Sequence, residues 1–311
     1  MRDIFADDAR HWQWILDRIR SVLVSNTYEE IRLPLLEYKE LFSRSVGEAT
    51  DIVEKEMYNL TDRDGGEITL RPEGTAGCVR ALIENGLIYN QTQRVFYAGE
   101  MFRYERPQKG RYRQFSQIGA ETFGMAGPEI DLELITLVTD IWDSLLLTDA
   151  LSLEINNLGS PESRASYRNA LLKYLKPLSE KLDVDSQNRI ETNPLRILDS
   201  KDLETQKLLE KAPVLADFVD SGSTSRFAEL CRVLTDLGVE YKINPRLVRG
   251  LDYYTDTVFE WTTDQLGAQG TLCGGGRYDG LVELLGGQPT PAAGFAIGLD
   301  RVALLHKSLK Q

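Results

Sequence analysis

Apolar residues recur at helical spacing near the N-terminus and at strand spacing further along the chain. From residue 8 to residue 24, the spacing of Trp12, Ile15 and Ile19 predicts an amphipathic helix. Alternating or β-branched runs predict strands at 30–33, 67–71, 151–155, 241–243 and 257–261, and glycine-rich strands at 270–280 and 294–298. Helical patterns follow Pro72, span 129–147, and begin again at Leu299.

Two long strands, at 94–105 and 113–123, are predicted to form a hairpin with an unusually long tip at 106–112. Alternate residues of a strand share a face, so Gln117, Gly119 and Glu121 lie together. Because Gly119 has no side chain, we expect a bare floor there on which a ligand could lie. A solvated polar face is the alternative, although Phe115 and Phe123 share that face.

The spacing of apolar residues changes between residues 160 and 237. Helical periodicity dominates there, and strand-like sequence resumes afterwards. We therefore expect a helical insertion domain at 160–237 within one domain formed by residues 1–159 and 238–311. The predicted fold class is α/β, of the α+β kind, with a mainly antiparallel sheet flanked by helices.

Composition excludes several classes of chemistry. The 311 residues include 36 Lys and Arg against 48 Asp and Glu, three cysteines and two histidines. Such scarcity argues against a disulfide framework, a Cys- or His-rich metal site and a Ser-His-Asp triad, so we expect no metal ligands in the chain. The sequence has no P-loop, GxSxG or GxGxxG motif. With no signal peptide and no long apolar run, we expect a cytoplasmic protein without membrane contact.

Basic residues are concentrated at the hairpin tip although the net charge is −12. Five of them against Glu105 leave residues 103–113 with a charge of +4 (5 − 1), which indicates phosphate binding, with a plain solvated loop as the alternative. Arg301 falls in the first turn of the last helix, where a cation opposes the helix dipole unless an anion lies nearby. Together, four arginines predict a nucleotide site on an antiparallel sheet: Arg103, Arg111, Arg249 and Arg301.

Motif by motif, the chain resembles the bacterial histidyl-tRNA synthetases, which are class II aminoacyl-tRNA synthetases. Residues 18–37, 102–115 and 294–301 resemble class II motifs 1, 2 and 3, and residues 70–75 and 247–254 resemble signatures specific to the histidine enzymes. The resemblance covers essentially the whole chain. It implies a class II antiparallel sheet and, because motif 1 forms much of the dimer interface in that family, a homodimer.

The resemblance also implies a two-step reaction with assigned residues. L-Histidine and ATP with Mg²⁺ give histidyl-adenylate and pyrophosphate, without a prosthetic group, and histidine then passes to the 3′ end of tRNA-His. Arg249 and Arg103 are the implied catalytic residues. The implied histidine-binding residues are Glu73, Gly74, Thr75, Arg103, Gln117, Glu121, Arg249, Tyr253, Tyr254 and Tyr278. Those implied for ATP are Arg103, Glu105, Arg111, Phe115 and Arg301, and those implied for the tRNA acceptor end are Arg106, Gln108, Lys109 and Arg113.

Two other interpretations remain. The family's C-terminal anticodon-binding domain is expected to be absent from this chain, which suits a catalytically silent paralogue, the regulatory subunit of ATP phosphoribosyltransferase. The arginines, Glu73 and the basic tip favour the enzyme instead, since a regulatory subunit needs no tRNA-facing loop. A binding-only tRNA sensor of the type fused to stress kinases is the third possibility, but no kinase sequence is present.

Overall fold

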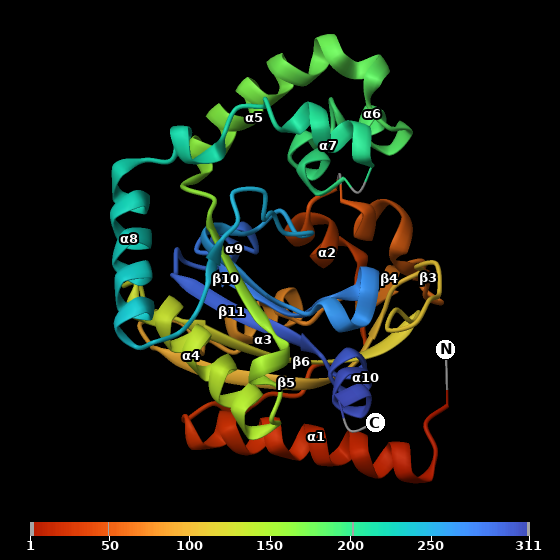
Figure 1. The fold of residues 1–311 in the computed structure, drawn as a ribbon. Coiled ribbons are helices and arrows are strands. Elements are labelled where there is room, and N and C mark those ends of the chain that lie inside the picture. The colour runs from red at the N-terminus through yellow and green to blue at the C-terminus, as the bar shows by residue number, and fades with distance from the viewer. Residues whose placement is uncertain (1–2, 49, 201, 310–311) are drawn as a thin grey trace.

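The computed structural model describes residues 3–48, 50–200 and 202–309. Within these residues an eight-stranded sheet forms the centre of the molecule (Figure 1). In order across the sheet, its strands are β1 (Glu29–Glu30), β5 (Gln93–Phe102), β6 (Gln114–Phe123), β11 (Ala292–Gly298), β10 (Thr271–Arg277), β9 (Thr255–Thr262), β7 (Ser152–Asn157) and β8 (Lys242–Ile243). Among these described strands only the outermost pairs, β1 with β5 and β7 with β8, are parallel. The predicted mainly antiparallel α/β fold is confirmed.

The strands around the hairpin tip end earlier than the sequence predicts. The first stops at Phe102 rather than at residue 105, because the Tyr104 amide leaves the ladder and donates to the Glu56 carbonyl at 2.6 Å. The predicted strand at 30–33 is reduced to β1. Ile31 still donates to the Phe96 carbonyl, but Pro34 lacks the amide hydrogen needed to continue.

A second, three-stranded sheet was not predicted. It consists of β2 (Leu36–Tyr38), β4 (Glu67–Leu70) and β3 (Tyr58–Thr61), and only β4 was expected. Between β2 and β3 lie α2 (Lys39–Val46) and a π-helical turn, η1 (Ile52–Glu56). The new strands have three and four residues, too few for an alternating pattern to stand out.

Helices cover both faces of the central sheet. One face packs against α1 (Ala6–Ser25), α4 (Glu129–Ser144) and α10 (Leu299–Leu309), with buried residues such as Ile19, Trp142 and Phe295 (Figure 1). On the opposite face lie α3 (Thr75–Glu84) and the short α9 (Leu281–Leu284), with Tyr97 and Phe123 from the sheet. Two 3₁₀ turns complete this part, η2 (Thr148–Ala150) and η6 (Asp264–Gln269).

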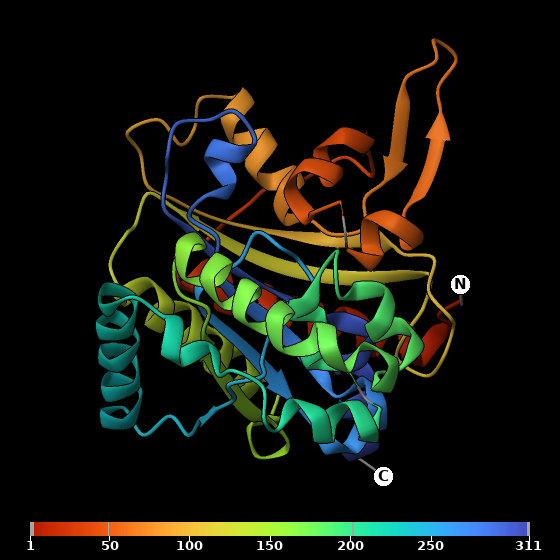
Figure 2. The same ribbon diagram turned by 90° about the horizontal axis from the view of Figure 1, so that it is seen from above.

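Between residues 161 and 236, all the regular elements that the structure describes are helices or 3₁₀ turns. These elements are α5 (Pro161–Leu175), η3 (Lys176–Lys181), α6 (Val184–Arg189), η4 (Pro194–Asp199), α7 (Leu203–Leu209), η5 (Leu215–Phe218) and α8 (Ser221–Asp236). Figures 1 and 2 show α5 to α7 over the sheet face that carries α3, and α8 at the side. Through Leu230 and Leu234, α8 joins the core around α4. We refer to residues 161–236 as the helical segment.

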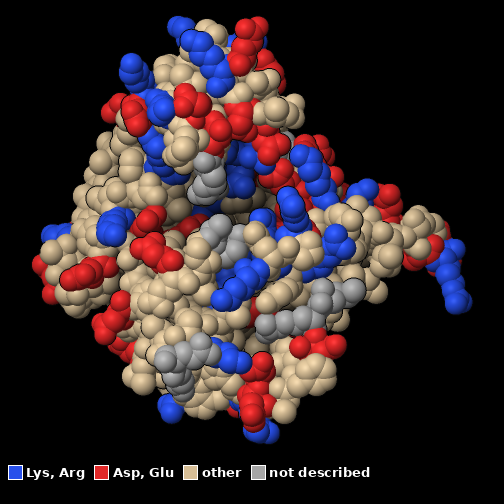
Figure 3. Space-filling model, turned by 45° about the vertical axis from the view of Figure 1, so that its right-hand side comes forward, with Lys and Arg blue, Asp and Glu red and all other residues tan. Residues whose placement is uncertain are grey.

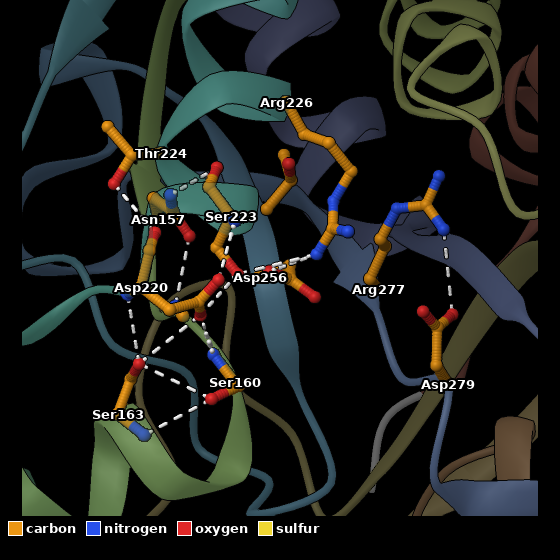
Figure 4. A network of polar contacts seen from close by, with 12 residues as sticks. Asn157, Ser160, Ser163, Asp220, Ser223, Thr224, Arg226, Asp256, Arg277 and Asp279 are labelled. Carbon is orange, nitrogen blue, oxygen red and sulfur yellow. Dashed lines mark hydrogen bonds and ion pairs between the residues drawn. The ribbon is translucent and has the colours of Figure 1, made fainter.

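The first and last helices of this segment are joined at their N-termini (Figure 4). Ser160 caps α5 and Asp220 caps α8, each accepting an amide three residues on. Asp220 also accepts hydrogen bonds from the Ser160 amide at 3.4 Å and the Ser163 hydroxyl at 3.3 Å. Hydrogen bonds from Ser223 hold the pKa of Asp220 well below its usual range. The Asp220 carboxylate thus holds the N-termini of α5 and α8 together.

Candidate active site

A cavity of about 270 Å³ lies on the α3 side of the central sheet, between the β5–β6 hairpin, the start of α3, and α10. Figure 3 shows Lys and Arg side chains gathered around a hollow on this side of the molecule. The predicted residues that line the cavity are Glu73, Gly74, Thr75, Arg103, Glu105, Arg111, Phe115, Gln117, Arg249, Tyr253, Tyr254 and Arg301. Residues up to 228 positions apart (301 − 73) therefore meet in one place.

Glu121 lies behind the cavity wall rather than in it. Its carboxylate accepts hydrogen bonds from Thr75 Oγ1 at 2.7 Å, from the Tyr97 hydroxyl at 3.0 Å and from the Tyr278 hydroxyl. Burial raises the pKa of Glu121 to about 8, against these three hydrogen bonds. Neither Glu121 nor Tyr278 lines the cavity in this structure, and both are about 1% exposed.

The expectation of a bare floor over Gly119 is wrong. A Cβ atom on Gly119 would come within 2.4 Å of the Tyr97 hydroxyl oxygen, and one on Gly74 would come within 2.2 Å of the same ring. Both glycines therefore admit the Tyr97 ring, which fills the space assigned to a ligand. Sequence reasoning missed Tyr97 as a site residue, although the hairpin register pairs it directly with Gly119.

Two acceptors face the cavity near the start of α3. The Glu73 carboxylate accepts the backbone amides of Thr75 at 2.6 Å and Ala76 at 2.9 Å, so it caps the helix. Burial raises its pKa despite these bonds. On β6, the buried Oε1 of Gln117 has no hydrogen-bond partner among the described residues. An unpaired buried acceptor is costly, so this end of the cavity suits a ligand that donates hydrogen bonds, such as an ammonium group.

Arg249 lies between the tyrosines and the sheet. It is paired with Glu260 of β9, and its guanidinium lies 5.7 Å from the centroid of the Tyr254 ring. Burial opposes its charge, but Glu260 and the neighbouring tyrosines raise its pKa, so Arg249 stays cationic. Gly274 makes room for it, since a Cβ there would lie 2.2 Å from the guanidinium. Sequence reasoning missed Glu260, although it is the only charge within the predicted strand at 257–261.

Three arginines gather at the other end of the cavity. Arg103 donates to the Pro72 carbonyl at 2.9 Å and lies 5.4 Å from the Phe115 ring centroid. Arg301, in the first turn of α10 as predicted, donates to the carbonyls of Gly110 and Thr271. Burial, followed by repulsion from Arg103 and Arg111, lowers the pKa of Arg301 to about 10. Such mutual repulsion is relieved by a polyanion, which makes this end a candidate phosphate site.

Glu105 is the carboxylate that pairs with Arg111 in this cluster. At the hairpin tip beyond it, Arg106, Gln108 and Lys109 are exposed and lie outside the cavity. Arg113 packs its guanidinium 4.0 Å from the centroid of the Tyr104 ring and donates to the Glu105 carbonyl. The four residues predicted for the tRNA acceptor end thus share the outer part of the hairpin.

The two histidines contact each other away from the cavity, with 2.7 Å between His11 Nε2 and His306 Nδ1. The three cysteines are free. Among the residues that the structure describes, no group of three or more His, Cys, Asp or Glu is arranged to hold a metal ion. No described helix is both long and apolar enough to cross a membrane.

Comparison with known proteins places this fold among the class II aminoacyl-tRNA synthetases. An apo S. aureus histidyl-tRNA synthetase is similar at 37% identity, with a TM-score of 0.79, over 100% of this chain and 73% of that one. The family model for histidyl-tRNA synthetase matches residues 1–302. The chain therefore belongs to the histidyl-tRNA synthetase family.

Two more distant solved structures share the fold at 22% identity. One is described as an ATP phosphoribosyltransferase regulatory subunit/histidyl-tRNA synthetase from Bacillus halodurans, with a TM-score of 0.70 over 98% of this chain and 81% of that one. The other is described as a histidine–tRNA ligase subunit from Alicyclobacillus acidocaldarius, with a TM-score of 0.69 over 100% of this chain and 97% of that one.

Proposed function

We propose that this chain activates L-histidine with ATP to histidyl-adenylate and transfers histidine to the 3′ end of tRNA-His. The observation that carries the proposal is a single cavity with two different ends. The buried carboxylate of Glu73 and several tyrosines line one end, and Arg103, Arg111 and Arg301 line the other. An amino acid and a nucleoside triphosphate could meet between them, beside Arg249.

At the first end, Glu73 and the unpaired oxygen of Gln117 would hold the ammonium group of histidine. Tyr253 and Tyr254 would line the imidazole. Because Glu121 is screened by Thr75, Tyr97 and Tyr278, we assign to it the task of orienting those three hydroxyls. A pocket of fixed hydroxyls rejects near-isosteres that leave buried polar groups unpaired.

At the second end, Arg301 would hold the γ-phosphate of ATP, which would bring Mg²⁺ with it as part of the substrate. Phe115 would stack on adenine and Glu105 would contact its amino group, while Arg111 would add positive charge. Arg103 would bridge the α-phosphate and the carboxylate of histidine. That carboxylate oxygen attacks the α-phosphorus, the bond to the bridging oxygen breaks, and pyrophosphate leaves with the electron pair. Arg249 would stabilise the charge that develops at the α-phosphate.

Two macromolecular partners complete the proposal. The exposed tip residues Arg106, Gln108 and Lys109, with Arg113, would meet the acceptor end of the tRNA, and the helical segment would lie against the acceptor stem. We also propose a homodimer, supported by the exposure of Leu35 (45%) and Leu36 (47%) in the motif 1 region. A monomeric mass in sedimentation would contradict the dimer.

The deciding experiment is histidine-dependent exchange of labelled pyrophosphate into ATP, without tRNA. We expect exchange with histidine and none with other amino acids. If histidine binds but exchange is absent, the proposal fails. The alternative, a regulatory subunit, would then be tested by pull-down with a phosphoribosyltransferase. The description of the Bacillus halodurans structure is the reason for considering it.

A further inference from the structure

Arg249, Tyr253 and Tyr254 lie in a segment without helix or strand. This segment, residues 247–254, leads into β9 through bends and turns, and we call it the arginine loop. A segment without a ladder leaves its carbonyl groups to be satisfied by neighbours. The position of the arginine loop therefore depends on contacts from elsewhere in the chain.

Around Asp252, those contacts come from two sides. On one side, the Asp252 amide donates to the Val46 carbonyl at the end of α2, at 3.0 Å. On the other side, Arg164 of α5 donates to the carbonyl of Asp252 at 3.1 Å and to the carbonyl of Tyr254. Asn193, also in the helical segment, donates to the Asp252 carboxylate at 3.2 Å. The helical segment thus forms one wall of the arginine loop.

The position of Arg164 costs free energy, and its contacts with the arginine loop offset that cost. Burial lowers its pKa, with partial compensation from Asp252. Its Nε atom is buried and has no hydrogen-bond partner among the described residues. A half-buried cation that donates hydrogen bonds to two backbone carbonyls of one loop restrains that loop, because breaking these bonds would leave the charge and the carbonyls unpaired.

We propose that Arg164 is a positioning residue for the arginine loop, so that the helical segment shapes the histidine end of the active site as well as any tRNA contact. The inference rests on the proposed function. It predicts a selective effect on the binding of histidine, because the loop carries Tyr253 and Tyr254. The residues proposed to hold ATP before the reaction lie on the β5–β6 hairpin and α10. Arg249 is also on the loop, but it is proposed to act on charge that develops during the reaction, so its displacement should slow exchange rather than raise the ATP KM.

Arg168 offers a matched control. It lies one turn further along α5, is exposed, and donates to the carbonyls of Glu191 at 3.3 Å and Thr192 at 3.1 Å. These acceptors belong to the helical segment itself. Replacing Arg168 therefore removes the same kind of hydrogen bond but none that is made to the arginine loop, which Arg168 influences only through the electrostatic effect of its charge on Asp252.

The test compares Arg164→Gln, Arg164→Lys and Arg168→Gln in the full chain. Histidine Kd is measured by calorimetry, and the KM values for histidine and ATP are measured by pyrophosphate exchange. We expect Arg164→Gln to raise the histidine Kd and KM roughly tenfold, the loss of one charge-assisted contact, with the ATP KM unchanged. Arg164→Lys should recover most of the loss, and Arg168→Gln should behave as the parent protein.

An unchanged histidine Kd in Arg164→Gln, or an equal rise in Arg168→Gln, would overturn the inference. A merely structural role would lower Tm and raise both KM values together, which would also overturn it. If the parent protein binds histidine without exchange, the proposed function fails, while the Kd comparison still decides the role of Arg164. If the parent does not bind histidine, both fail.

Discussion

The two ends of the cavity differ in how far the protein satisfies its own charges. At the tyrosine end, Glu121 accepts three hydroxyl hydrogen bonds and Glu73 caps α3. At the arginine end, Arg103 and Arg301 donate to backbone carbonyls, and the carboxylate paired within the cluster is Glu105. The pKa values shift accordingly: burial raises those of the carboxylates at one end and lowers that of Arg301 at the other.

This difference indicates two modes of recognition. The tyrosine end is already organised as a hydrogen-bonded cage, so a ligand there is selected by shape and by complementary donors. At the arginine end, burial and then repulsion from Arg103 and Arg111 lower the pKa of Arg301, so a bound anion should be stabilised there. Binding at the arginine end should therefore depend strongly on salt. Binding at the tyrosine end should depend on it less, because Glu73, the carboxylate proposed to hold the ammonium group there, is buried.

The largest expected effect comes from Arg249, which lies where the two ends meet. We expect Arg249→His to slow pyrophosphate exchange by roughly 10²–10³-fold, as for loss of one preorganised donor, with little change in histidine Kd. Exchange kinetics and calorimetry measure the two quantities. Equal losses in both would show that Arg249 serves ground-state binding instead.

Arg301→Gln should weaken binding at the arginine end and leave binding at the tyrosine end unchanged. Removing this cation should raise the ATP KM by roughly tenfold or more, because one charge-assisted contact to phosphate is lost. The histidine Kd should not change. Lys307→Gln is the control on the same helix, since Lys307 is exposed and pairs with Asp8. If the parent, Arg301→Gln and Lys307→Gln all have the same ATP KM, Arg301 does not hold a phosphate group.

The pKa of Glu121 predicts how stability depends on pH. Its folded value of about 8 lies above its ordinary value of 4.5, so the folded protein keeps a proton that the unfolded chain releases. This contribution is full below the ordinary value and is lost as the pH rises through about 8. The free energy of unfolding should fall by up to about 1.4 kcal/mol per pH unit in that window.

Chemical denaturation of the parent protein and of Glu121→Gln between pH 5 and about 8.5 isolates this contribution. The amide keeps the shape but cannot titrate, so the stability difference between the two proteins should depend on pH with the slope given above. A difference that is independent of pH would show that Glu121 is ionised in the folded protein.

The smallest expected effect is that of salt. Raising the ionic strength from about 0.05 to 0.3 M shortens the Debye length from roughly 14 to 6 Å, and should raise the ATP KM about two- to threefold. The histidine KM should rise less, because Glu73, which is proposed to hold the ammonium group, is buried, and salt screens buried charges less. A parallel rise in both constants would contradict the distinction between the two ends.

Part of this site could be predicted from the sequence. The +4 charge of residues 103–113 and the position of Arg301 in a first helical turn favour a phosphate site over a plain solvated loop, and the structure brings Arg103, Arg111 and Arg301 to one cavity. Tyr97 could not be assigned in this way. In the sequence it is one of four aromatic residues in the predicted strand at 94–105, and its role arises only because Gly74 and Gly119 flank its ring.

Glu260 illustrates the same limit. A lone charge in an apolar strand can be noticed, but its pairing with Arg249 depends on how the arginine loop folds back over β9 and β10. The strands β2 and β3 went unpredicted because they hold so few residues that pairing with β4, not local pattern, defines them. Tertiary contacts decided each of these features.

The capping carboxylate of Asp220 also matters for the entropy of the chain. Because Ser160 and Asp220 are hydrogen bonded, the 59 intervening residues (220 − 160 − 1) form a loop closed at its base. Each doubling of such a loop costs only about 0.6 kcal/mol. Residues 161–219 therefore act on the central sheet almost as a short connection would, whatever the length of that stretch. Insertions or deletions within that loop should leave the register of β7 and β9 unchanged.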